Sequence, residues 1–206
     1  KFLEGLRNDY PDRPIVVMSA LAEGSDRLVA AEALELRMSL TAVLPMRREL
    51  YLHDFASPES VADFERLLAA ASDVFELPLT PGNTDVSIRE PGKNRSRQYA
   101  QAGVFLCAHC HVLIALWDGR QSDKLGGTSQ VVRFHHHDVM PGYTPLATSS
   151  RLTLTDDESD LVYHVDWERM ASADAGEPFE PVPLGELRET AALALAEVLA
   201  MRGKER

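Results

Sequence analysis

The sequence predicts an α/β domain with a mainly parallel sheet, and three observations lead to this prediction. Short, almost continuously apolar runs alternate with amphipathic stretches of helical length. Such runs are typical of parallel strands whose two faces are both covered by helices. With 206 residues, the chain is long enough for one such domain with a sizeable core and short for two. We therefore expect a single three-layer domain over residues 1–206.

The N-terminal half begins with a strand–helix–strand unit. Residues 14–19 form an apolar, β-rich run that predicts a buried strand, and residues 25–37 follow as a helix. The apolar face of that helix consists of Val29, Ala33 and Leu36. Residues 40–44 predict the next strand, which ends at Pro45 because proline has no N–H to donate to a sheet.

A second helix and a short strand follow. Ser57 and Pro58 are typical of an N-cap and a first helical position, so they predict the start of a helix. Residues 74–79 indicate a short strand, which Pro78 confines to an edge or an end of the sheet. Residues 80–94 are rich in Gly, Pro, Asn and Thr and predict a loop.

The C-terminal half repeats the alternation. It predicts a helix at residues 95–110, a strongly apolar strand at 111–117 and a helix from about 128 to 136. Residues 140–206 are expected to form a peripheral extension, with a last strand at 161–165 and a C-terminal helix. The apolar stripe of that helix consists of Leu187, Ala191, Leu195 and Val198.

The three most apolar runs are expected to be parallel neighbours in one sheet. They are residues 14–19, 40–44 and 111–117. Near-continuous apolar character indicates that helices cover both faces of these strands. In such a sheet, ligands bind beyond the carboxyl ends of the strands.

Composition and charge limit the partners of the chain. Asp and Glu total 32 against 21 Lys and Arg, which gives a net charge of -11. This acidity disfavours non-specific binding to nucleic acids and to anionic membranes. No apolar run reaches the roughly 18 residues of a membrane span. Two cysteines are too few for a disulfide framework and no signal peptide is visible, so we expect a cytoplasmic protein. Because the chain begins at Lys1 and soon enters structured-looking sequence, we expect a preceding N-terminal piece.

The turn at residues 20–27, between a strand and a helix, is the first candidate ligand site. A helix N-terminus offers free N–H groups and a partial positive charge to an anion. Gly24 permits close approach of the backbone to a ligand, and Ser25 or Asp26 is suited to cap the helix. The alternative is that Glu23 and Asp26 only complement the helix dipole.

A second turn of the same kind follows the strand at 111–117. Gly126 and Gly127 remove Cβ obstruction, and the backbone N–H groups with the Thr128 hydroxyl are suited to hold a phosphate. Gly127 is expected to need a positive φ. Asp118 is placed to accept hydrogen bonds from a ribose. The alternative is a tight turn with an N-cap, and neither turn has the glycine spacing of the dinucleotide fingerprint or the P-loop.

At these two turns the chain resembles the SLOG superfamily, which groups the DprA and LOG proteins. Residues 21–34 (LAEGSDRLVAAEAL) resemble the GAxGADxxA segment of its YpsA-like branch. Residues 112–119 (VLIALWDG) and 126–132 (GGTSQVV) resemble its second motif and, more distantly, nucleoside 2-deoxyribosyltransferases. The resemblance covers about residues 14–137 and implies a Rossmann-like domain that binds a nucleotide or nucleotide-derived ligand. The positions that carry over are Gly24, Ser25, Asp26, Gly126, Gly127 and Thr128.

Two departures from the family pattern bear on catalysis. LOG phosphoribohydrolases and the deoxyribosyltransferases have a Glu where this chain has Val131, and a valine cannot act as a nucleophile. The chain also lacks the strand and glycine-bearing loop with which related chains usually begin. Glu23 and Asp118 remain as weak candidates for a catalytic acid or base.

We therefore expect a sensor-like module that binds a nucleotide or nucleotide-derived ligand, with no cofactor. Its two turns are expected to lie side by side and to enclose one pocket. The expected ligand-binding residues are Glu23, Gly24, Ser25, Asp26, Arg27, Asp118, Gly126, Gly127, Thr128 and Ser129. One alternative is an enzyme that hydrolyses or transfers the N-glycosidic bonds of nucleosides or nucleotides. The other is a structural domain that dimerises through apolar helix faces, and a homo-oligomer is compatible with each of these functions.

The cysteines and histidines match part of a haem or zinc motif, but their sequence context does not favour either kind of site. Cys107, Cys110 and His111 spell CxxCH, the haem attachment signature, but this segment runs into the apolar strand and no export signal is visible. We expect two reduced, buried thiols instead. Zinc binding by the two cysteines with part of residues 135–137 is the alternative, but no partner motif has clear spacing, so no metal site is expected.

Lys93, Arg95 and Arg97 form the densest basic cluster of the chain, close to Tyr99. They are either the solvated start of a helix or a phosphate contact beside which Tyr99 stacks on a base.

Overall fold

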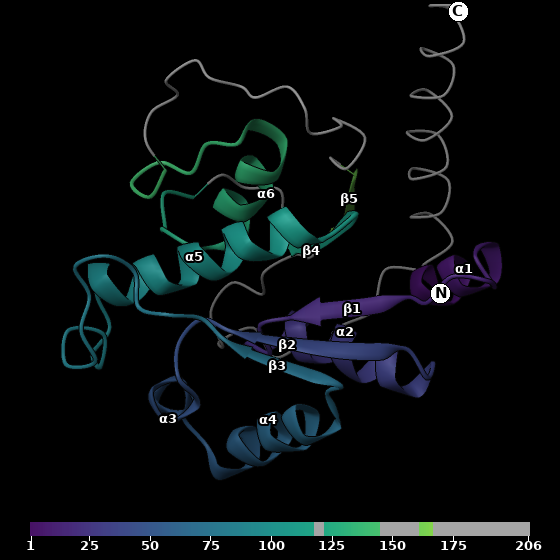
Figure 1. Ribbon diagram of the computed structural model, residues 1–206, viewed down its shortest axis with the longest axis horizontal. Coiled ribbons are helices and arrows are strands. Elements are labelled where there is room, and N and C mark those ends of the chain that lie inside the picture. The colour runs from purple at the N-terminus through teal and green to yellow at the C-terminus, as the bar shows by residue number, and fades with distance from the viewer. Residues whose placement is uncertain (118–121, 145–160, 167–206) are drawn as a thin grey trace, which may run out of the picture.

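The computed structural model describes residues 1–117, 122–144 and 161–166. Helices alternate with parallel strands along the chain (Figure 1). This arrangement confirms the predicted α/β class. The expected C-terminal helix and Asp118 lie outside the described residues.

The main sheet of the described chain has three parallel strands in the order β1-β2-β3. β1 (Val16–Ser19) pairs with β2 (Ser39–Leu44), and β2 pairs with β3 (Asp73–Glu76). β2 is buried from Leu40 to Leu44 because it lies between the other two strands and between two layers of helices. β3 is an edge strand with four exposed residues, as the proline at position 78 predicted.

Helices lie on both faces of this sheet (Figure 1). α2 (Ser25–Glu35) and α4 (Pro58–Ala70) cover one face, and α5 (Lys93–His109) covers the other. α4 begins as the sequence predicts, because the Ser57 hydroxyl accepts the N–H of Ser60 at 3.1 Å. The three layers therefore follow from the order of the predicted elements.

Alternation along β2 divides the interior into two cores. Ala42 and Leu44 belong to the core on the side of α2 and α4, together with Phe64. Val43 points the other way and packs with Ala102 of α5. This is the period of two that a strand imposes on its side chains.

β4 (Val112–Trp117) does not join the main sheet, and this part of the prediction is wrong. Its six residues pair in parallel with β5 (Leu161–Asp166), so the two strands form a separate sheet in the described part of the chain. α6 (Thr128–His137) packs against β4 and α5. The apolar run correctly indicated a covered strand, but apolar character carries no information about which strand forms the hydrogen-bonded ladder.

Three short helices were not predicted. They are α1 (Phe2–Asp9), α3 (Arg48–Tyr51) and the 3-10 helix η1 (Leu52–Asp54). α3 and η1 are too short to show a helical period in the sequence. Among the helices that the structure describes, none is long and apolar enough to cross a membrane.

The side chain of Gln98 anchors the long loop that follows β3. Gln98 is fully buried on α5, and its Nε2 donates to the carbonyls of Pro45 at 2.9 Å and Pro78 at 3.2 Å. Its Oε1 accepts the N–H of Thr80 at 2.7 Å and the Nδ2 of Asn83 at 3.1 Å. A buried amide with all these partners ties the segments that follow β2 and β3 to one helix.

Candidate functional site

The turn after β1 has two residues of positive φ, Leu21 and Gly24, of which only Leu21 is strained. Leu21 has a φ of 56° and is fully buried, and Gly24 has a φ of 92°. A left-handed conformation costs a non-glycine residue about 1–2 kcal/mol, and such strain is concentrated at functional sites. Sequence reasoning singled out Gly24 but missed Leu21, because leucine normally avoids this conformation.

Hydrogen bonds hold the turn against the first turn of α2. The Ser19 hydroxyl accepts the N–H of Leu21 at 3.1 Å and donates to the carbonyl of Asp26 at 3.3 Å. The carboxyl of Asp26 accepts the N–H of Ala22 at 3.4 Å. Because this carboxyl faces the turn, it does not cap the helix, and the predicted cap by Ser25 or Asp26 is wrong.

The start of α2 is therefore open at the carboxyl end of β1. Gly24 is the N-cap, and within the described residues no side-chain cap bonds to the first N–H groups of the helix. A Cβ built on Gly24 would meet nothing within 4 Å, so the space in front of this glycine is free. Free N–H groups and the positive end of the helix dipole make this position suitable for an anion.

A buried polar cluster lies behind the turn. Burial raises the pKa of Asp26, although the N–H of Ala22 lowers it in part, so this carboxyl holds its proton more strongly than an exposed one. Tyr51 is 1% exposed, and its hydroxyl has no hydrogen-bond partner within the described ranges. Burial raises the pKa of Tyr51 well above its ordinary value, and the nearby carboxylate of Asp26 raises it further.

Arg27, which the sequence analysis names as a ligand-binding residue, is a buried side chain. Its Nε donates to the carbonyl of Leu21 at 3.0 Å, and its Nη1 donates to the carbonyl and the hydroxyl of Ser60 at 2.8 and 2.9 Å. The guanidinium carbon lies 4.3 Å from the centre of the Phe55 ring. The ring of Tyr51 packs on the same phenylalanine at 5.1 Å, so Arg27 and the tyrosine are close neighbours.

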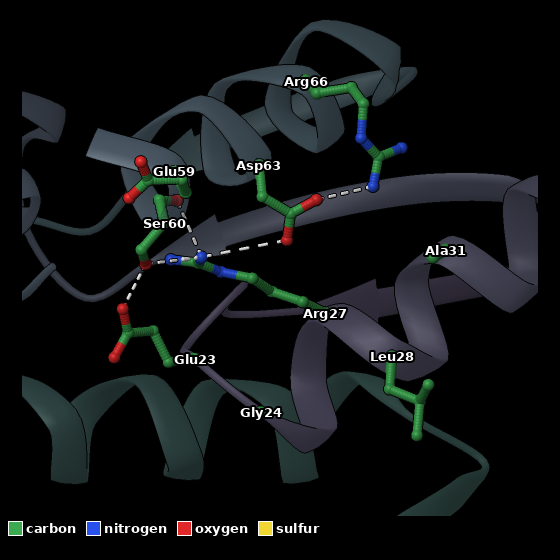
Figure 2. A pocket seen from close by; sticks show the side chains of 9 residues that line it. All are labelled: Glu23, Gly24, Arg27, Leu28, Ala31, Glu59, Ser60, Asp63 and Arg66. Carbon is green, nitrogen blue, oxygen red and sulfur yellow. Dashed lines mark hydrogen bonds and ion pairs between the residues drawn. The ribbon is translucent and has the colours of Figure 1, made fainter. Parts of the chain in front are cut away.

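A groove of about 480 Å³ lies between α2 and α4 (Figure 2). Its lining consists of Glu23, Gly24, Arg27, Leu28, Ala31, Glu59, Ser60, Asp63 and Arg66. Three expected site residues, Glu23, Gly24 and Arg27, thus line one groove. No residue of the second turn belongs to this lining.

The second turn packs against α5. Gly126 has a φ of 76°, and a Cβ built there would lie 2.7 Å from the backbone N of Ala100 and from the Cβ of Tyr99. Gly127 has a φ of -78° and donates its N–H to the carbonyl of Lys124 at 3.0 Å. The expected positive φ at Gly127 is therefore wrong, because the left-handed residue of this turn is its neighbour, which approaches the α5 backbone.

α6 also begins on a glycine without a side-chain cap. Thr128 is exposed at its first position, and Ser129 accepts the N–H of Ser122 at 2.9 Å. Tyr99, on which Gly126 packs, has its ring centre 6.4 Å from that of Tyr51, beside the first turn. The first turn thus lies near Tyr51 and the second near Tyr99, and their enclosure of one ligand stays a prediction.

The basic cluster at the start of α5 has a structural role at Arg95. This side chain is 3% exposed, and its nitrogens reach the carboxylate of Asp54 at 2.8 Å and the carbonyls of Leu50 and Ile88. The hydroxyl of Tyr99 donates to the other oxygen of the same carboxylate. These bonds occupy both side chains, so they do not favour the interpretation of Arg95 and Tyr99 as a phosphate and base contact.

Cys107 and Cys110, near the C-terminal end of α5, are free thiols. They are half-buried rather than fully buried as predicted. Cys107 donates to the carbonyl of Val131 at 3.7 Å, and this contact joins α5 to α6. Over the described ranges, no three His, Cys, Asp or Glu side chains are arranged to hold a metal ion.

Both thiols are expected to react slowly with iodoacetamide in the folded protein at about pH 8, because the thiolate is the reactive form. Burial raises the pKa of Cys107 to about 12 and also raises the pKa of Cys110. Mass spectrometry should show alkylation that accelerates as the pH rises. The same protein in guanidinium chloride is the control and should react at once, whereas fast alkylation of the folded chain at about pH 8 would contradict the expectation.

Comparisons of the chain with protein-family models, with curated proteins and with solved structures found no match. The arrangement of β1, α2 and β2 is a parallel βαβ unit of the Rossmann-like kind. The fold thus stands without a family assignment, and any function has to be argued from the site itself.

Proposed function

We propose that the protein binds a phosphate-bearing, nucleotide-derived ligand at the carboxyl end of β1. The observation that carries this proposal is the open, glycine-led start of α2, which follows a strained turn. α4 lies on the same face of the sheet, and there Ser57 caps the helix with its own hydroxyl. The start of α2 keeps its N–H groups for a ligand anion.

The residues that resemble the SLOG superfamily support the same class of ligand. They fall on both glycine-led helix starts, at Gly24 and at Gly127. In that family the two motifs serve a nucleotide or nucleotide-derived ligand, which favours a sensor-like module here. A net charge of -11 repels anions at long range, so the dipoles of α2 and α6 have to supply the local positive potential.

Replacing Ser25 with glutamate is expected to abolish binding of inorganic phosphate and AMP without unfolding the protein. Ser25 is the first residue of α2, and a carboxylate there competes with a bound phosphate for the same N–H groups. An acidic residue in a first helical turn contributes about 0.3–1 kcal/mol of stability, so the variant should remain folded. Isothermal titration calorimetry measures the affinity, and circular dichroism verifies the fold.

The matched control is Ser72→Glu, which adds the same charge at the amino end of the sheet. Ser72 is exposed and immediately precedes β3. Thr128→Glu, at the start of α6, tests whether the second turn shares the ligand. Loss of affinity in Ser25→Glu and Thr128→Glu but not in Ser72→Glu supports one site with two helix starts. Unchanged affinity in a folded Ser25→Glu variant contradicts the proposal.

Cleavage of N-glycosidic bonds is the second candidate function, and Asp26 is the residue that favours it. Burial raises the pKa of this carboxyl, which shifts it toward the range that suits a general acid at a leaving base. Glu23 is exposed and bonds to Ser60 of α4, which suits it less to this role. Chromatography of AMP after incubation with the protein separates the functions, since free adenine indicates an enzyme and intact AMP a binding module.

A further inference from the structure

We propose that the groove between α2 and α4 is a second phosphate subsite, at which the carboxylate of Glu23 and a ligand phosphate compete for the hydroxyl of Ser60. The subsite is formed by Ser60 and by the buried Arg27 beneath it. This inference rests on the proposed function, because the first phosphate of the ligand binds at the start of α2. The ligand class is then a diphosphate, such as the diphosphate group of a nucleotide.

The carboxylate of Glu23 shows which chemistry this groove accepts. Glu23 directly precedes the N-cap residue Gly24, yet its side chain crosses to α4 and accepts the hydroxyl proton of Ser60 (Figure 2). The hydroxyl in turn accepts from Nη1 of Arg27 at 2.9 Å. A carboxylate oxyanion thus already accepts from the Ser60 hydroxyl, one residue away from the proposed phosphate position.

The guanidinium of Arg27, which lines the groove, has one donor without a hydrogen-bond partner among the described residues. Arg27 is 6% exposed, and its Nη2 is buried without a hydrogen-bond partner in the described part of the protein. Figure 2 shows the guanidinium directed from α2 toward Ser60 on α4. A buried N–H without an acceptor is costly. Because Nη2 is closed to solvent, a phosphate oxygen beside Ser60 supplies this acceptor only after the side chains there move apart.

Among the described contacts, the other two acidic residues of the groove do not bond to the hydroxyl of Ser60. Asp63 pairs with Arg66 at 2.7 Å and with Arg27 at 3.9 Å. The carboxylate of Glu59 accepts from its own backbone N–H and from Ser57, which lowers its pKa. Glu23 is thus the groove carboxylate that competes directly for the Ser60 hydroxyl. Displacement of the Glu23 carboxylate, rather than a general decrease in negative charge, should make the Ser60 hydroxyl available to a phosphate.

Calorimetry with pyrophosphate and inorganic phosphate tests this subsite. Glu23→Gln removes the competing charge, so pyrophosphate should bind about tenfold more tightly than to the wild type, since a charge-assisted hydrogen bond is no longer displaced. Glu59→Gln is the matched control, because it removes the same charge from the same groove and leaves Glu23 in place. It should change the pyrophosphate affinity by at most about twofold. Inorganic phosphate should respond weakly to both substitutions.

Adding Ser60→Ala to Glu23→Gln should cancel the gain for pyrophosphate, because the hydroxyl donor is then missing. If Glu23→Gln and Glu59→Gln alter pyrophosphate binding equally, the effect is one of net charge, and the subsite is overturned while the proposed function stands. If neither probe binds to the wild type or to any variant, the proposed function and the subsite are both overturned.

Discussion

Replacing Arg95 with methionine is expected to lower the free energy of unfolding by about 3 kcal/mol or more. The guanidinium is 3% exposed, and its removal leaves the carboxylate of Asp54 without its cation. The carbonyls of Leu50 and Ile88 lose their donors at the same time. The two carbonyls are then buried and unsatisfied, which costs more than the bonds themselves contribute. The carboxylate of Asp54 contributes less, because it is exposed and keeps its bond to Tyr99. Urea denaturation followed by circular dichroism measures the change.

Lys93→Met is the matched control for this experiment. Lys93 lies on the same helix, two residues earlier, and is exposed. Its replacement should change the free energy of unfolding by less than about 0.5 kcal/mol. Equal, small effects of the two substitutions would show that Arg95 does not stabilise the loop before α5.

Replacing Gly126 with alanine is expected to destabilise the protein by about 3 kcal/mol, from two separate causes. The residue has a φ of 76°, which alanine adopts only with strain. The new Cβ would also lie 2.7 Å from the backbone N of Ala100 and from the Cβ of Tyr99, so the turn or α5 has to move. Thermal and urea unfolding measure the loss of stability.

Gly24→Ala separates the two causes. Gly24 has a φ of 92°, but a Cβ there would meet nothing within 4 Å, so this variant shows the backbone strain alone. It should lose about 1–2 kcal/mol, clearly less than Gly126→Ala. Equal losses in the two variants would mean that the close approach of the second turn to α5 does not contribute.

The first turn illustrates how far local sequence reasoning reaches. The glycine at position 24 marks a turn in any sequence, because glycine adopts positive φ without cost. The same reasoning assigned the positive φ of the second turn to Gly127, whereas the structure places it at Gly126. A rule based on the local sequence cannot distinguish two adjacent glycines. Only the packing of Gly126 on α5 shows which of them has the positive φ.

The burial of three polar residues could not be predicted from the sequence. Arg27 and Arg95 are both arginines, and arginine is normally exposed at the protein surface. Both are buried here because partners distant in the sequence accept hydrogen bonds from their guanidinium groups: Ser60 from Arg27 and Asp54 from Arg95. Tyr51 could not be found from the sequence either, since α3 is one turn long and has no period.

The amino-acid sequence by itself determined several elements of this protein: the apolar runs of β1 and β2, the cap of α4 by Ser57, and the edge position of β3 before Pro78. Each of these follows from backbone geometry over a few residues. Only the tertiary structure decided that β4 pairs with β5 and that Glu23 crosses to Ser60. Strand pairing and side-chain contacts depend on which segments meet in space, and a local pattern contains no information about partners tens of residues away.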